Sequence, residues 1–139
     1  MKFGIDPESL REVPDEYEAW TQIGVAARVL GRLDLAEEAL TTAFALRPST
    51  AARLRLAHVY QWQGRFTEAH AEFARCADSG EIADFVHQHW GKCYFDEGRF
   101  EEARAHFRKA LDLREGGDPA LVESTRIALR AVEARRAAR

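Results

Sequence analysis

The chain has 139 residues and a formal net charge of −3 at pH 7, and 46% of its residues are hydrophobic. This length is sufficient for one domain with an apolar core. No apolar run approaches the roughly 18 residues that a membrane span needs, and the acidic segment 1–16 lacks the apolar core of a signal peptide. We therefore predict a cytoplasmic protein without a membrane partner. Nucleic-acid binders are usually basic, so the acidic balance also argues against that class.

Three glycines divide the chain into similar units. Gly31, Gly64 and Gly98 follow one another at spacings of 33 and 34 residues, and each is followed by Arg and then by Leu or Phe. An alanine stands five residues after each glycine, and a large apolar residue stands four positions later. A period of this size indicates stacked helical repeats. We expect each glycine to end the first helix of a pair, because glycine readily adopts the left-handed conformation of a tight turn.

The pattern predicts an all-α chain of paired helices. The expected pairs are 15–30 with 34–47, 50–63 with 67–79, and 82–97 with 100–114. In the third pair, apolar residues recur on one helix face at Val86, Trp90, Cys93 and Tyr94. Small residues such as Gly91 and Ala103 would let paired helices approach closely. Asp118 and Pro119 are typical of a helix start, and an apolar stripe follows, so we expect a final capping helix from about 119.

These repeats resemble the tetratricopeptide repeat, a helix–turn–helix of 34 residues. The units would span 17–49, 50–83 and 84–117, with an arm or short helix at 1–16 and the capping helix at 118–139. The resemblance implies a right-handed α-α superhelix with a concave groove. It also implies a protein–protein interaction adaptor or scaffold that binds a peptide or partner protein in that groove.

In this family the first helix of each unit lines the groove. Those positions and their neighbours predict a peptide-binding groove formed by Arg28, Arg55, His58, Gln61, Gln88, His89, Lys92 and Phe95, with Trp62 beside them. Cationic, amide and aromatic side chains predominate, which suits a peptide of acidic or carboxy-terminal character. The carboxylate clamp of some chaperone-binding members does not carry over, since its positions fall on Thr21, Val25, Arg55, Phe85 and His89.

Catalytic and cofactor motifs are absent from the sequence: it has no GxSxG, Gly-rich phosphate loop, HExxH or paired CxxC. We therefore predict no enzymatic activity and no cofactor. His89 and Cys93 are four residues apart and could supply two metal ligands, but a structural zinc site needs four, so no metal is expected. Cys76 and Cys93 are predicted to be buried free thiols.

An alternative function follows from the charges at the two ends. Residues 1–19 carry two basic and six acidic side chains (2 − 6 = −4), and residues 119–139 carry five basic and two acidic ones (5 − 2 = +3). Head-to-tail contact between copies would give a self-associating structural module. Exposed ion pairs are weak, so a monomer or weak homodimer is the simpler expectation. The basic outer face of the last helix could contact nucleic acid, but we favour a solvated face.

Overall fold

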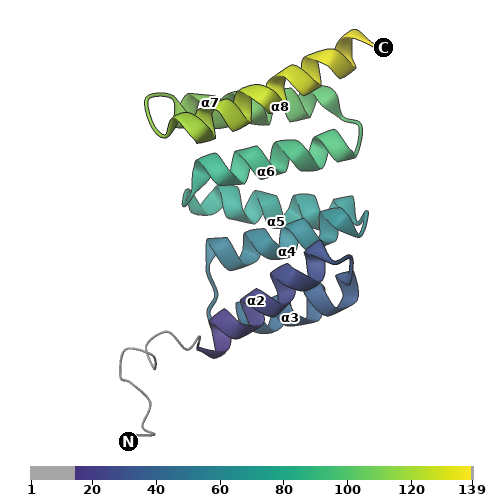
Figure 1. Cartoon of the computed structure of the whole chain (residues 1–139), viewed down its shortest axis with the longest axis vertical. Coiled ribbons are helices and arrows are strands. Elements are labelled where there is room, and N and C mark those ends of the chain that lie inside the picture. Colours follow the sequence, from purple (N-terminus) through teal and green to yellow (C-terminus); the bar gives the residue numbers. More distant parts are fainter. Residues whose placement is uncertain (1–14, 139) are drawn as a thin grey trace, which may run out of the picture.

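The structure is a computed structural model that describes residues 15–138. Within this range it is an all-α helical repeat, and no strand occurs there. The helices are α2 (Glu16–Val29), α3 (Leu33–Leu46), α4 (Thr50–Trp62), α5 (Phe66–Ser79), α6 (Ala83–Asp96), α7 (Phe100–Arg114) and α8 (Pro119–Ala137). They stack one after another along the long axis of the molecule, with α2 and α3 at one end and α8 at the other (Figure 1). The helix bounds agree with the predicted ones to within about one residue, while the predicted arm 1–16 lies almost entirely outside the described residues.

The same turn joins the two helices of each pair. Gly31, Gly64 and Gly98 have φ values of +79°, +75° and +82°, which confirms the left-handed conformation expected for them. In each turn the amide of the following arginine donates to a carbonyl five residues earlier, for example from Arg65 N to Tyr60 O at 2.8 Å. This bond satisfies a carbonyl that the helix end would otherwise leave unpaired.

Paired helices are close because glycine stands where a side chain has no room. A Cβ atom built on Gly91 of α6 would lie 2.7 Å from ring carbons of Phe107 on α7. A Cβ on Gly24 of α2 would lie 2.4 Å from Leu40 on α3. The close approach was predicted, and the three atoms nearest to a Cβ at Gly91 belong to the Phe107 ring.

The core runs along the array between successive helices. Phe73, Val86, Cys76 and Cys93 are at most 1% exposed and form the centre of the cluster shared by α4, α5 and α6. Both cysteines are buried free thiols, as predicted. Burial raises the pKa of Cys76 to about 11 and that of Cys93 to about 12. The thiols are therefore protonated at neutral pH and act as small apolar groups.

The last helix is fastened to the array by a buried arginine. Arg114 is 5% exposed, and its guanidinium donates to Asp84 Oδ2 at 3.0 Å and to Thr125 Oγ1 at 3.0 Å. Thr125 is fully buried and donates to Gln88 Oε1 at 2.9 Å. Val132 completes the attachment, packing in the same cluster as Phe107. No helix in the described part of the chain is long and apolar enough to cross a membrane.

Candidate functional site

The first helices of the repeats form one layer. Helix α2 contacts α4, α4 contacts α6, and α6 contacts α8, whereas the second helices α3, α5 and α7, all within the described range, do not contact one another. In a curved stack, helices on the inner side lie closer together than helices on the outer side. The first helices and α8 contact one another, so they line the inner side of the stack. This is the side where the sequence predicted a binding groove.

Two adjoining pockets open on this inner side. The first, which we call the cationic pocket, has a volume of about 220 Å³ and is lined by Arg28, His58, Gln61, Trp62, His89 and Lys92. The second, the apolar pocket, has a volume of about 340 Å³ and is lined by Gln61, Trp62, Lys92, Phe95, Asp96, Phe107, Ala128 and Ala131. Three lining residues are common to both, so the pockets are continuous. We refer to them together as the groove.

The cationic pocket gathers positive charge that no carboxylate neutralises. Arg28 and Lys92 have no carboxylate within 4 Å among residues 15–138, and the Arg28 guanidinium lies 4.7 Å from the centre of the Trp62 ring. Most other arginines of the described chain are paired. Examples of such pairs are Arg47–Asp15, Arg53–Glu72, Arg104–Glu133, Arg114–Asp84 and Arg136–Glu101.

Two histidines form the floor of the cationic pocket. The rings of His58 on α4 and His89 on α6 meet edge to face, with centres 4.3 Å apart. Burial, and then the charge on Lys92, lower the pKa of His89 to about 4. Burial and the neighbouring His89 lower the pKa of His58 well below its usual value. Both rings are therefore neutral at pH 7, and the standing charge of the pocket comes from Arg28 and Lys92.

The apolar pocket combines aromatic rings with the last helix. Trp62 is 49% exposed at the end of α4, while Phe107 is 2% exposed at the base of the pocket. Two alanines of α8, Ala128 and Ala131, form the opposite wall. Where the two pockets meet, Gln61 Nε2 donates to Asp96 Oδ2 at 2.7 Å. This bond fixes the Gln61 amide and leaves the aromatic surface of Trp62 open to solvent.

The structure brings together six of the eight predicted groove residues, which are Arg28, His58, Gln61, His89, Lys92 and Phe95. Arg55 lines neither pocket, and its guanidinium donates to the Tyr17 hydroxyl at 3.0 Å. Gln88 is 2% exposed beneath α8, where it accepts from Thr125. The wall supplied by α8 was missed. Its one sequence signal is a pair of alanines three residues apart on the last helix, which alone does not distinguish a pocket wall from ordinary packing.

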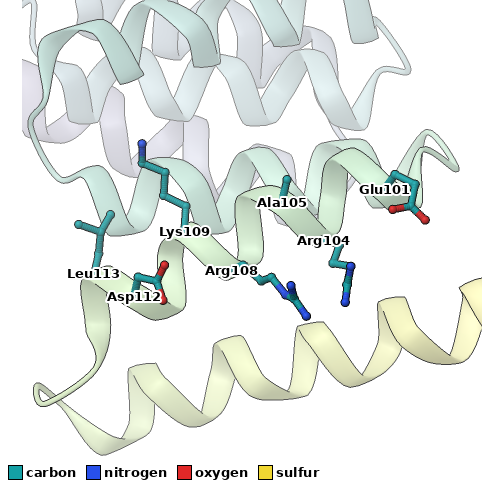
Figure 2. Close-up of a pocket in the computed structure, with 7 residues that line it drawn as sticks. All are labelled: Glu101, Arg104, Ala105, Arg108, Lys109, Asp112 and Leu113. Atoms are coloured by element: carbon teal, nitrogen blue, oxygen red, sulfur yellow. The ribbon is translucent and has the colours of Figure 1, made fainter.

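A larger cleft lies elsewhere, along the outer side of α7 (Figure 2). It has a volume of about 610 Å³ and is lined only by α7 residues, both acidic and basic. Arg104 points from it toward α8 (Figure 2), where it pairs with Glu133 at 2.7 Å, and Glu101 pairs with Arg136 at 2.6 Å. Two of its five charged residues are thus ion-paired, and the other three, Arg108, Lys109 and Asp112, are of mixed sign, so we assign no binding role to it.

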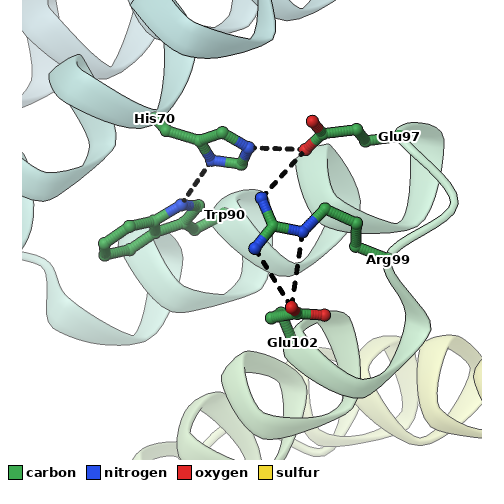
Figure 3. A network of polar contacts seen from close by, with 5 residues as sticks. All are labelled: His70, Trp90, Glu97, Arg99 and Glu102. Carbon is green, nitrogen blue, oxygen red and sulfur yellow. Dashed lines mark hydrogen bonds and ion pairs between the residues drawn. The ribbon is translucent and has the colours of Figure 1, made fainter.

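The remaining histidines, His70, His87 and His106, lie on α5, α6 and α7, and Figure 3 shows the contacts of His70. Trp90 Nε1 donates to His70 Nδ1 at 3.0 Å, and His70 Nε2 lies 2.7 Å from Glu97 Oε1. Because Nδ1 accepts from the indole, the His70 proton resides on Nε2 and is donated to Glu97. His87 and His106 approach each other through their Nδ1 atoms at 3.0 Å. Within residues 15–138 no cluster of three or more His, Cys, Asp or Glu side chains is arranged to hold a metal ion.

Comparison with known proteins supports the repeat assignment. Family models described as tetratricopeptide repeat match residues 17–50 and residues 85–116. Among curated proteins, none matches this chain.

Several solved structures have a similar fold. PcrH from Pseudomonas aeruginosa, in complex with the chaperone binding region of PopD, is 21% identical over 98% of this chain and 99% of its own, with a TM-score of 0.68. The translocator chaperone SycD from Yersinia enterocolitica is 19% identical over 94% of this chain and 98% of its own, with a TM-score of 0.74. MamA from AMB-1 is 31% identical over 82% of this chain and 63% of its own, with a TM-score of 0.58.

The two matched segments contain the first and third helix pairs, and α4 and α5 repeat the same pair between them. The glycine turns, the helix lengths and the layer of first helices all agree with this match. The chain therefore contains tetratricopeptide repeats at residues 17–50 and 85–116.

Proposed function

We propose that this protein-interaction module holds an extended peptide segment of a partner protein in the groove, without catalysing a reaction. The observation that carries the proposal is the composition of the cationic pocket. Arg28 and Lys92 are left without a carboxylate in the described chain, directly beside the exposed ring of Trp62. Exposed aromatic surface next to unpaired cations is typical of recognition sites rather than of solvated helix faces.

An acidic partner fits this groove best. A carboxylate that approaches Arg28 and Lys92 gains charge-assisted hydrogen bonds and does not have to break an existing ion pair. Asp96 is the one carboxylate among the lining residues, and it already accepts from Gln61. The field that a ligand meets in the cationic pocket is therefore positive.

Solved structures with a similar fold support a peptide ligand. One contains SycD with a peptide of the translocator YopD, and another contains PcrH with the chaperone binding region of PopD. A third contains the TPR2AB domain of yeast Sti1 with pHSP90. The low identities do not transfer these partners to the present chain. They do support a segment of another protein as the class of ligand.

Self-association through the ends is the weaker alternative, because much of the basic charge on α8 is paired internally. On α8, Arg126 lies 3.9 Å from Glu115, Arg130 lies 2.9 Å from Glu123, and Arg136 pairs with Glu101. These pairs reduce the basic charge that α8 could offer to a head-to-tail contact. Most of the acidic segment 1–19 lies outside the described residues, and within them Asp15 pairs with Arg47 at 2.6 Å.

The proposal is tested by locating where peptides bind. A pool of random dodecamer peptides on beads is panned against the protein, and enriched peptides are titrated into ¹⁵N-labelled protein by NMR. We expect shifts at the Trp62 indole and at α4 and α6 backbone amides, and weaker binding in Lys92→Glu. The matched control is Lys109→Glu, which reverses a lysine on the outer side of α7. Shifts confined to the outer side of α7, or no enrichment above a scrambled pool, would overturn the proposal.

A further inference from the structure

We infer that the groove recognises a two-part motif, a large apolar side chain in the apolar pocket and a carboxylate in the cationic pocket, and that the histidine pair takes up a proton when the carboxylate binds. This inference rests on the proposed function and specifies the ligand of the same groove.

The two pockets differ in chemistry and are continuous in space. The apolar pocket is walled by Trp62, Phe95, Phe107 and two alanines, and the cationic pocket by Arg28, Lys92 and two imidazoles. An extended peptide places the side chains of every second residue on one face, about 7 Å apart. Because the two pockets share Gln61, Trp62 and Lys92 as lining residues, the proposed motif places the carboxylate two residues from the apolar side chain.

The surroundings of the histidines explain the expected proton uptake. Arg28 of α2 and His89 and Lys92 of α6 face His58. Lys92 of α6, Arg114 of α7 and Arg28 of α2 face His89, and His58 of α4 touches its ring. Burial and these cationic groups together disfavour protonated imidazole in the empty pocket. A bound carboxylate offsets part of the cationic charge, because an adjacent opposite charge stabilises the imidazolium.

The test uses short synthetic peptides with both ends blocked. The reference peptide is acetyl-Gly-Ser-Leu-Ser-Glu-Ser-Gly-amide, and its partners replace Glu by Gln, replace Leu by Ala, or separate Leu and Glu by three further serines. One further peptide has Gln in place of Glu and ends directly after it with an unblocked terminal carboxylate. Its affinity distinguishes recognition of a side-chain carboxylate from recognition of a terminal one. Affinities are measured by NMR titration of the full chain, and circular dichroism checks folding at each pH.

We expect the wild-type protein to bind the Gln and Ala peptides at least fivefold more weakly than the reference peptide. The Lys92→Met protein should bind the reference peptide and the Gln peptide with equal affinity. Because the pKa of His89 is about 4 in the empty pocket, the reference affinity should rise as the pH falls from 7.0 to 5.0, by at most tenfold per pH unit for one proton. The affinity for the Gln peptide should show no such rise. In the His89→Gln protein, the rise in affinity for the reference peptide should be smaller.

The outcomes separate this inference from the proposed function. Groove shifts with equal affinities for the reference, Gln and Ala peptides would overturn the two-part motif and leave peptide binding intact. A reference affinity independent of pH would overturn the proton uptake. Failure of every peptide to shift groove resonances at millimolar concentration would overturn both the motif and the groove as the binding site. Lys109→Met serves as the matched control and should behave as the wild type does.

Discussion

Replacing Gly91 with alanine tests the close packing of α6 on α7. The new methyl group would lie 2.7 Å from two ring carbons of Phe107 and 3.1 Å from a third. The ring has little room to move, because Phe107 is 2% exposed and packs with Phe100, Ala103 and Val132. Such overpacking costs about 1–3 kcal/mol, while replacing glycine within a helix returns roughly 0.5–1 kcal/mol. The net expectation is a loss of about 1–2 kcal/mol.

The assay is thermal unfolding followed by far-ultraviolet circular dichroism at pH 7.5. A loss of this size lowers the melting temperature by roughly 3–8 °C for a chain of this length. The double variant Gly91→Ala/Phe107→Leu provides the control. Shrinking the ring should relieve the overlap, so the double variant should be more stable than the sum of the two single losses predicts. A Gly91→Ala variant more stable than the wild type, or strictly additive losses, would refute the close approach.

Three other predictions concern the stability of the fold at low pH, the attachment of α8 and the N-cap of α8. Burial lowers the pKa of His87, and lowers that of His106 to about 4. The unfolded chain therefore binds more protons below about pH 6.5, and the urea midpoint should fall between pH 6.5 and pH 4 and be steady above that range. Arg114→Met, which leaves Asp84 without its buried partner, should cost about 2–4 kcal/mol and increase hydrogen exchange in α8, whereas unchanged exchange would contradict the attachment described above. Asp118→Ala removes the acceptor at the start of α8 and should cost about 1 kcal/mol in a thermal melt.

The helix pairs could be predicted because local signals and tertiary packing agree. Each of Gly31, Gly64 and Gly98 marks a turn that requires a positive φ, and the apolar period identifies the buried faces. Asp118 and Pro119 mark the start of α8 in the same way. Each signal is local, so a single sequence contains what is needed to place the helix bounds.

The groove was only partly predictable, since its composition depends on how α8 docks. Position in the repeat selected Arg28, His58 and Lys92, which the structure brings together in one pocket. The same rule also selected Gln88, which the capping helix covers. Which face of α8 meets α6 depends on the buried contacts of Arg114, a long-range arrangement that helical periodicity does not determine.

The attachment of α8 has a consequence for any ligand of the apolar pocket. Among the helices of residues 15–138, α8 contacts only α6 and α7, so its docking is a local equilibrium that can open without unfolding the rest of the array. When α8 detaches, the pocket loses the wall formed by Ala128 and Ala131, and Phe107 becomes exposed. The apparent affinity of the pocket is then its intrinsic affinity multiplied by the fraction of molecules with α8 docked. Arg114 lines neither pocket, so substitutions there would weaken binding in the apolar pocket through that fraction.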